Sequence, residues 1–208
     1  MCLCAAGHML YYERKFKGQG RDLVIGVDEA GRGPLAGPVV AAAVFLKTSS
    51  FNNRIDDSKK LTCLQREKAF PEIIEKSVSG IGIMNEKVID RVNILEATRL
   101  AMEQAINGLF AKMPGVEPGR VHILVDGLVK LKIGFPFTDI IKGDSKSLSI
   151  ASASILAKVT RDRIMRIYDK TFPQYGFSRH KGYPTQAHRN ALKKYGKSVI
   201  HRATFSGV

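Results

Sequence analysis

The sequence predicts an α/β fold in which a mixed sheet is flanked by helices and followed by a basic helical extension. Five apolar runs rich in β-branched residues are typical of short strands, namely residues 23–28, 38–46, 78–84, 121–126 and 137–141. Two longer segments space their apolar residues as amphipathic helices do. The first three strands follow one another with little helix between them, which favours mixed connectivity in one sheet.

The loop between the first two strands is rich in glycine and proline. It reads GRGPLAGP over residues 31–38, a composition that predicts a sharp loop. After a polar stretch, Thr62 opens a window of apolar residues at helical spacing. Pro71 lies inside this window, and we expect it to interrupt or kink the helix because proline lacks the N–H group that a helix uses.

Further helices are predicted downstream. Asn93 is suited to cap a helix over residues 94–113, whose apolar positions keep near-3.6 spacing. A second long helix is expected from Ser147 to about Tyr168, and its small first turns (SIASASILA) are typical of a helix pressed against a sheet. A last helix is expected to begin near Thr185.

Length and composition indicate one globular domain. The chain has 208 residues, of which 44% are hydrophobic and 25% charged, so it can bury a sizeable core and is neither disordered nor collagen-like. We expect an N-terminal segment over residues 1–21, an α/β core over 22–157 and a basic extension over 158–208. The triplet at residues 7–9 (GHM) is typical of a cloning junction, so residues 1–8 need not be native.

The sequence points to a cytoplasmic protein. No run approaches the roughly 20 apolar residues of a membrane helix, and the first ten residues lack the basic and apolar regions of a secretory signal. Cys2, Cys4 and Cys63 are an odd and sparse set, which favours a reducing compartment over a disulfide framework. Cys2 and Cys4 lack the second pair that zinc sites use, so we do not expect a metal clip there.

The net charge of +14 is concentrated near the C-terminus. Between Lys158 and Arg202 stand twelve Lys or Arg and two Asp, which gives this segment a charge of +10. Interleaved aromatic residues indicate that it folds, and its charge predicts a nucleic acid as partner; the alternative is a solvated face. His180, His188 and His201 lie there as candidates for phosphate contact or simple exposure, whereas His122, inside a strand, is expected to be structural.

Four acidic residues end or closely follow three apolar strands: Asp28, Glu29, Asp126 and Asp144. Because strand ends can meet at one edge of a sheet, we expect these carboxylates to converge and to require a cation between them. Oxygen ligands without His or Cys favour Mg²⁺ or Mn²⁺. Asp28 and Glu29 would point to opposite faces of a strand, so we expect the chain to turn at Glu29.

Such a cluster beside a basic tract suits metal-assisted phosphodiester hydrolysis. No Ser-His-Asp or Cys-His set competes with it in the sequence. The alternative for each acid is an ordinary helix N-cap.

Five blocks in order resemble the signature motifs of ribonuclease HII, the bacterial type 2 ribonuclease H: Gly26–Val44, Asp57–Thr62, Val125–Gly127, Lys142–Arg163 and Tyr175–His188. The resemblance implies an RNase H-like fold with a mixed five-stranded sheet. It also implies a divalent-metal endonuclease that cuts RNA in RNA/DNA hybrids and cuts 5′ to ribonucleotides embedded in duplex DNA, leaving 3′-hydroxyl and 5′-phosphate ends.

The resemblance also assigns roles to single residues. The metal-binding acids of the family fall on the four acids named above, and its Gly-Arg-Gly motif falls on Gly31, Arg32 and Gly33, whose backbone is implied to approach the ribonucleotide 2′-OH. Tyr183 resembles the tyrosine that packs on the neighbouring sugar; the alternative is a core tyrosine.

Other side chains in these blocks are less defined by the resemblance. Lys59 and Ser145 are candidate phosphate contacts, and Arg161 and Arg163 are expected on a solvated helix face or paired with Asp162. We expect a monomer. The rival functions are a catalytically silent hybrid-binding protein and a different metal nuclease on the same fold.

Overall fold

The computed structural model describes residues 8–208; Cys2, Cys4 and most of the suspected cloning junction lie outside them. Five strands form one sheet in the order β3-β2-β1-β4-β5. Strand β1 pairs antiparallel with β2 and parallel with β4, so the sheet is mixed, as predicted. The strands are β1 (Leu23–Ala30), β2 (Val39–Leu46), β3 (Ser77–Met84), β4 (Val121–Asp126) and β5 (Phe137–Ile140).

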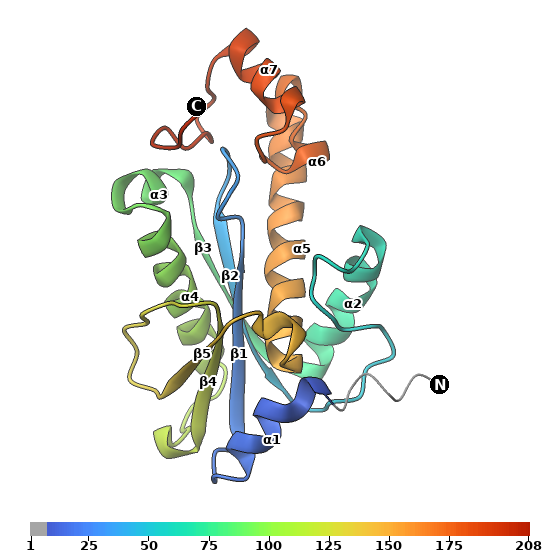
Figure 1. Ribbon diagram of the computed structural model, residues 1–208, viewed down its shortest axis with the longest axis vertical. Helices are drawn as coiled ribbons and strands as arrows, with labels where there is room; N and C mark the ends of the chain where they lie inside the picture. The colour runs from blue at the N-terminus through green and yellow to red at the C-terminus, as the bar shows by residue number, and fades with distance from the viewer. Residues whose placement is uncertain (1–7) are drawn as a thin grey trace.

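The helices lie on both faces of this sheet and at its two ends (Figure 1). Their predicted starts near Asn93, Ser147 and Thr185 are confirmed, because each of these side chains accepts a hydrogen bond from a backbone N–H of the first turn. The helices are α1 (Tyr11–Lys17), α2 (Cys63–Lys76), α3 (Glu86–Val92), α4 (Ile94–Phe110), α5 (Leu148–Thr171), α6 (Phe177–His180) and α7 (Gln186–Tyr195), with short 3-10 turns η1 (His8–Leu10), η2 (Pro118–Arg120), η3 (Gly143–Ser145) and η4 (Pro173–Tyr175).

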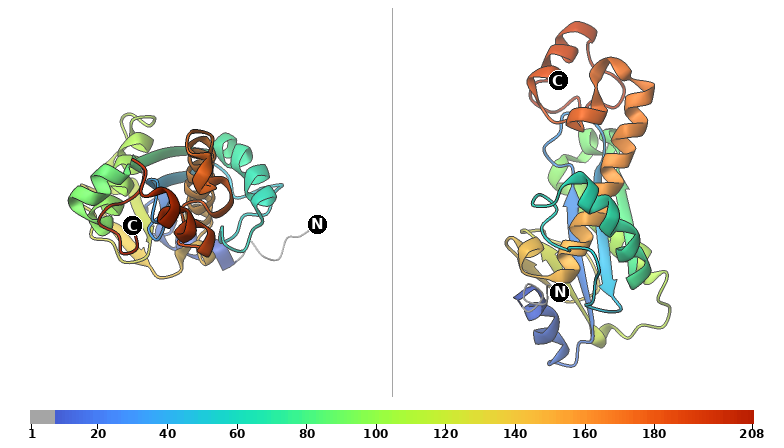
Figure 2. Two further views of the ribbon diagram at one scale, coloured as in Figure 1. Left: turned by 90° about the horizontal axis from the view of Figure 1, so that it is seen from above. Right: turned by 90° about the vertical axis from the view of Figure 1, so that its right-hand side faces the viewer.

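The two largest hydrophobic cores hold the layers together. Helix α4 covers one face of the sheet, and α5 with α2 covers the other, as the view from above shows (Figure 2). The alternating residues of β2 serve both cores, with Ala41 and Ala43 facing α4 and Ala42 and Val44 facing α5 and α2. The small residues of α5 pack closely as predicted: a Cβ on Gly26 of β1 would lie 2.2 Å from the backbone of Ile150.

Two local predictions are wrong. Pro71 does not interrupt α2, which runs unbroken over 14 residues. A capping box at Thr62 fixes the helix start and the buried side chains of Ala69 and Ile73 anchor it against the core, which outweighs the missing hydrogen bond. The chain also does not turn at Glu29, because β1 stays paired with β2 as far as Ala30.

Helix α5 continues beyond the sheet and carries a C-terminal module of η4, α6, α7 and the last residues (Figures 1 and 2). Its core contains Met165, Tyr175, Phe177 and Ile200. The predicted boundary between residues 157 and 158 lies inside α5, so the extension begins as the second half of a helix whose first half packs on the sheet. Within residues 8–208, no helix is long and apolar enough to cross a membrane.

Candidate active site

The parallel pairing of β1 and β4 brings two acids together. Val27 pairs with Val125 in this ladder, so the following residues, Asp28 and Asp126, lie side by side at the same edge of the sheet. Asp28 is buried and Asp126 is partly buried. The strand register therefore places two carboxylates next to each other without any loop between them.

The third carboxylate comes from the turn after β5. Asp144 lies in η3, and the N–H of Gly143 in the same turn donates to Asp126 Oδ1 over 2.6 Å. Carboxylate oxygens of Asp28, Asp126 and Asp144 all lie within 4.8 Å of one another. Three of the four acids found in the sequence thus converge, and the hydrogen bond at Gly143 ties their supporting elements together.

Glu29 lies beside this group. Because β1 continues through Ala30, Glu29 projects to the face opposite Asp28, where Arg32 Nη1 lies 3.4 Å from its Oε1. Glu29 does not share the 4.8 Å cluster, although Asp126 is close enough to affect its pKa. Asp28 and Glu29 therefore lie at the same edge of the sheet but on its opposite faces.

Burial and mutual repulsion disfavour the ionised form of these carboxyl groups. Burial raises the pKa of Asp28 well above its usual range, and repulsion from Glu29 and Asp126 adds to this shift. Burial also raises the pKa of Asp144, with Asp126 and Asp57 contributing, while Lys59 opposes it. Burial raises the pKa of Glu29 as well, against the attraction of Arg32.

A divalent cation fits this donor set. The convergent atoms are all carboxylate oxygens, and two of the three residues are almost inaccessible to solvent, Asp28 at 4% and Asp144 at 3% exposure. Lys59, whose Nζ lies 3.4 Å from Asp144 Oδ2, is largely exposed and pairs with one acid only. Mutual repulsion of buried oxygens is relieved by a hard cation between them, which is the chemistry of Mg²⁺ or Mn²⁺.

The glycine-rich turn follows directly after β1. Gly31 adopts φ = 101°, and a Cβ there would lie 2.1 Å from Arg161 and 2.7 Å from the carbonyl oxygen of Pro38, so only glycine fits. Gly33 is exposed, and a Cβ built on it would lie 3.8 Å from the ring of Tyr183. The structure brings Gly33 and Tyr183 together although 149 intervening residues separate them in the sequence.

Tyr183 lies at the surface. It is 42% exposed, which is inconsistent with the alternative of a core tyrosine. Lys158 Nζ lies 5.9 Å from the centre of its ring and Arg161 Cζ lies 6.0 Å from it. The partly exposed ring therefore lies beside the Gly33 backbone, with positive charge close by.

The two candidate phosphate contacts are placed differently. Lys59 is exposed beside Asp144, where its ammonium group can reach a phosphate at the acid cluster. Ser145 donates its hydroxyl to the carbonyl of Lys142 over 2.9 Å, so that hydroxyl supports its own turn.

The basic segment carries less free charge than its composition suggests. Arg161 was expected on a solvated face, but it is fully buried, because helical spacing places it on the stripe of α5 that packs against the β1–β2 loop. Arg163 is exposed and pairs with Glu67, together with Arg166, and not with Asp162. Asp162 pairs instead with Lys158 on the same helix and with Arg66 of α2.

Six basic side chains of this segment remain exposed and, within residues 8–208, have no carboxylate within 4.0 Å: Lys170, Arg179, Arg189, Lys193, Lys194 and Lys197. Three of them cluster at the end of α7 and just beyond it. The phosphate-binding surface predicted from a charge of +10 is thus limited to these six positions, which we call the outer basic surface.

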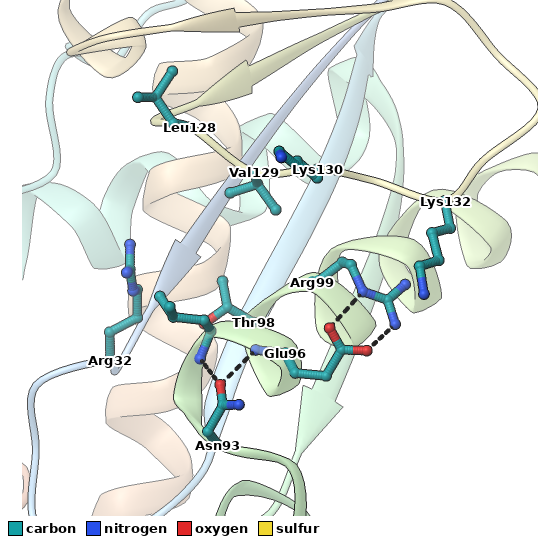
Figure 3. Close-up of a pocket in the computed structure, with 10 residues that line it drawn as sticks. Arg32, Asn93, Glu96, Thr98, Arg99, Leu128, Val129, Lys130 and Lys132 are labelled. Carbon is teal, nitrogen blue, oxygen red and sulfur yellow. Dashed lines mark hydrogen bonds and ion pairs between the residues drawn. The ribbon is translucent and has the colours of Figure 1, made fainter.

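A pocket beside the glycine-rich turn adds positive charge that the sequence did not indicate. It lies between the start of α4 and the segment after β4, and Arg32, Lys130 and Lys132 line it (Figure 3). Arg99, at the same pocket, is neutralised by ion pairs with Glu96 and Glu103. Arg32 is also paired, with Glu29, so Lys130 and Lys132 supply the net positive charge of this second basic surface.

The histidines of the basic segment are not surface groups. His188 and His201 are buried at 0% and 4% exposure, so neither predicted alternative, phosphate contact or exposure, holds for them. His180 is half-buried and stacks on His188. His122 is buried inside β4, in hydrogen-bonding contact with Thr138, as expected for a structural residue.

Sequence reasoning missed the buried Arg161 and Arg202. A signal existed for Arg161: it stands four residues after Ala157 and four before Met165, both buried on α5, so the helical period already put it on the apolar stripe. No comparable signal existed for Arg202, which lies in an irregular segment.

Comparison with known proteins yields one consistent family. The family model described as ribonuclease HII matches residues 25–208. The chain is 51% identical to the ribonuclease HII of Acetivibrio thermocellus, covering 95% of this chain and 75% of that protein, and 54% identical to that of Ruminiclostridium cellulolyticum with the same two coverages. The crystal structure of ribonuclease H2 from Pyrococcus horikoshii superposes with a TM-score of 0.67 at 28% identity, over 88% of this chain and 94% of that chain.

Proposed function

The chain belongs to the ribonuclease HII family and is a ribonuclease H, and from this premise we propose that it cuts the phosphodiester 5′ to a ribonucleotide, in RNA/DNA hybrids and within duplex DNA. The products are a 3′-hydroxyl and a 5′-phosphate. The observation that carries this proposal is the convergence of three buried or half-buried carboxylates beside a backbone turn that can approach a ribose.

The acid cluster supports the hydrolytic role. Asp28, Asp126 and Asp144 would hold Mg²⁺ or Mn²⁺, with Glu29 at the rim of the group. The bound metal supplies activation of water and stabilisation of the phosphate charge in the transition state. Lys59 lies beside Asp144 and can bind a non-bridging phosphate oxygen, which would orient the scissile group.

The glycine turn and Tyr183 support selection for ribose. Gly33 has no side chain, so its backbone can approach the 2′-OH that distinguishes RNA from DNA. The ring of Tyr183 lies beside it and can pack against the next sugar, where a second 2′-OH would be crowded. We call Gly31, Arg32, Gly33 and Tyr183 the 2′-hydroxyl sensor.

The two basic surfaces support binding of a duplex. The outer basic surface and the pocket with Lys130 and Lys132 would provide phosphate contacts on different elements. With six contacts from the outer surface alone, log K for a hybrid should fall against log salt with a slope of about −5. Replacing Lys193 and Lys194 by Gln should reduce that slope by about 2.

The matched control for this measurement is Arg163→Gln. Its charge is already paired with Glu67, so the slope should stay unchanged. A slope that is flat for the wild-type protein would contradict the role of both basic surfaces.

The decisive experiment uses a labelled DNA duplex with a single ribonucleotide, incubated with the protein and Mg²⁺ or Mn²⁺ and resolved on a sequencing gel. An all-DNA duplex and an EDTA reaction are the controls. We expect one metal-dependent cut immediately 5′ to the ribonucleotide. Binding without cleavage would favour a silent hybrid-binding protein, and cleavage of the all-DNA duplex would favour a different metal nuclease.

We also propose that the protein works in the cytoplasm. Cys63 is a free and exposed thiol, which persists in a reducing compartment.

A further inference from the structure

The 2′-hydroxyl sensor is made of two exposed segments that are distant in sequence. Gly33 and Tyr183 both face solvent, yet their positions relative to each other must be accurate if they are to measure one hydroxyl group. Exposed loops do not hold such geometry by themselves. The structure shows buried side chains behind each half, and they come from neighbouring residues.

Arg202 holds the glycine half. Its side chain is fully buried and donates to the carbonyls of Gly31 over 2.6 Å, Arg32 over 2.9 Å and Gly37 over 2.8 and 2.9 Å. In a trans peptide the C=O and N–H groups point in opposite directions. Because the carbonyls of Gly31 and Arg32 point inward to Arg202, the N–H groups of Arg32 and Gly33 point away from it.

These two N–H groups have no hydrogen-bond partner within residues 8–208. Two adjacent outward N–H groups form a small site for an oxygen acceptor, such as a ribose hydroxyl or a phosphate oxygen. The position of the Arg202 guanidinium group therefore determines which way the N–H groups of Arg32 and Gly33 point.

His201 holds the tyrosine half through a chain of hydrogen bonds. The N–H of Ser198 donates to His201 Nδ1 over 2.9 Å, so the proton of a neutral His201 ring is on Nε2. His201 Nε2 lies 3.0 Å from His188 Nε2, which must accept, and His188 Nδ1 then donates to the carbonyl of Tyr183 over 3.0 Å. Each hydrogen bond in this series is donated toward Tyr183 from His201 onward, and the last one ends on the Tyr183 carbonyl.

The surroundings keep both rings neutral. Tyr175, Phe177 and His180 pack against them, and burial lowers the pKa of His201 to about 4, with His188 contributing. Burial also lowers the pKa of His188, with His180 and Arg189 adding to the shift. A second proton on His188 would sit on Nε2 and face the N–H of His201, and a second proton on His201 would sit on Nδ1 and face the N–H of Ser198. The arrangement with one proton on each ring is therefore stable at neutral pH.

The two anchors are consecutive residues of one backbone-paired segment. His201 forms a bridge with Ala36, and the N–H of Arg202 donates to the carbonyl of Leu35 over 2.8 Å. Side chains of consecutive residues in extended backbone point to opposite sides. The Arg202 side chain therefore reaches the glycine turn, and the His201 side chain reaches His188, which is hydrogen-bonded to Tyr183.

We propose that His201 and Arg202 are a shared positioning pair that aligns both halves of the 2′-hydroxyl sensor, and thereby sets selectivity for ribose without contact with the substrate. The proposal rests on the sensor role of Gly33 and Tyr183 proposed above. It predicts that either side chain controls the rate of the cut more than the affinity for a duplex.

The test compares Arg202→Lys and His201→Phe with the wild-type protein. The lysine keeps the buried charge but cannot bridge three carbonyls, and the phenylalanine keeps the ring but ends the hydrogen-bond chain. Single-turnover rates on the one-ribonucleotide duplex should fall by about a hundredfold, while the Kd for an all-DNA duplex stays within about twofold. His201→Gln retains an N–H donor toward His188 and should restore most of the rate.

Arg163→Lys is the matched control, since this exposed arginine pairs with Glu67 away from the sensor, and it should leave rate and Kd unchanged. A second readout does not depend on activity: the ¹⁵N–¹H resonances of Arg32 and Gly33 should shift in Arg202→Lys, and those of Tyr183 and Thr185 in His201→Phe.

Unchanged amide resonances, or a rate that stays at the wild-type value in both variants, would overturn the proposal. A loss of rate that merely follows a loss of folded protein, with no rescue by Gln, would also overturn it. If the wild-type protein makes no cut, the proposed function fails separately, and the resonances still decide the positioning role.

Discussion

The active-site edge buries negative charge and the C-terminal module buries positive charge, and the two regions handle it in opposite ways. Arg161 and Arg202 are fully buried, and every hydrogen bond of their guanidinium groups goes to a backbone carbonyl. Asp28 and Asp144 are as buried, but they face other carboxylates.

The difference shows in the pKa values. Burial lowers the pKa of Arg161 to about 10 and that of Arg202 to about 9, so both remain charged at neutral pH inside a set of carbonyl acceptors. Burial and mutual repulsion raise the pKa of Asp28. The comparison teaches that the protein itself supplies the hydrogen-bond partners of the arginines, whereas the mutual repulsion of the acids is what the proposed metal ion would relieve.

The largest effect should follow from Asp126→Asn. The amide oxygen can still accept the Gly143 N–H, but one negative charge of the metal site is lost. A loss of about 4 kcal/mol of transition-state stabilisation corresponds to about a thousandfold lower cleavage rate. Gel assays at saturating enzyme measure the rate, and filter binding measures the affinity for a hybrid, which should be retained. Loss of binding together with cleavage would show that Asp126 is structural.

In the region with the buried arginines, the corresponding substitution should lower the stability of the fold. Arg161→Met leaves the carbonyls of Ala36, Pro38 and Lys181 buried without their donor, at a cost of about 1–3 kcal/mol for each group. Urea denaturation should show a loss of at least about 3 kcal/mol in the free energy of unfolding. Arg163→Met, on the same helix but exposed, should cost less than about 1 kcal/mol. Similar losses in both variants would remove the distinction between the two arginines.

Adding metal should stabilise the whole protein through binding at the acidic region. At a hundredfold excess over its Kd, Mg²⁺ or Mn²⁺ should raise the free energy of unfolding by about 2.7 kcal/mol. Thermal unfolding with and without the metal measures this change, and Asp126→Asn is the control that should respond little. Equal stabilisation of both proteins would place the metal elsewhere.

A smaller, pH-dependent effect should come from His122, a buried base outside both regions. Burial lowers its pKa from 6.5 to about 4, with Arg21 and Lys15 contributing, so the unfolded state binds more protons than the folded state in this interval. Stability contributed by neutral His122 is therefore present above pH 6.5 and is lost as the pH falls toward 4, by at most about 1.4 kcal/mol per unit.

Denaturation of the wild-type protein and of His122→Gln over pH 4–7 measures the difference in slope. Identical slopes would show that His122 titrates normally. The shared carboxylates cancel in this comparison, so their raised pKa values do not obscure it.

Much of the fold was predictable because local patterns and tertiary structure agree. The strand ranges, the caps at Asn93, Ser147 and Thr185, and the close packing of α5 all follow from periodicity and side-chain chemistry. The convergence of Asp28, Asp126 and Asp144 was also predictable, since each acid follows an apolar run and parallel strand ends meet at one edge.

By itself, the sequence determined the sheet, its main helices and the acidic residues at its edge, because hydrophobic period and strand-end position are local properties. Only the tertiary structure decided that Glu29 stays on β1, that Arg161, Arg202, His188 and His201 are interior, and that Gly33 lies against Tyr183. The physical reason is that a charged or titratable side chain is buried only where distant backbone groups supply its hydrogen bonds, and no local pattern encodes those partners.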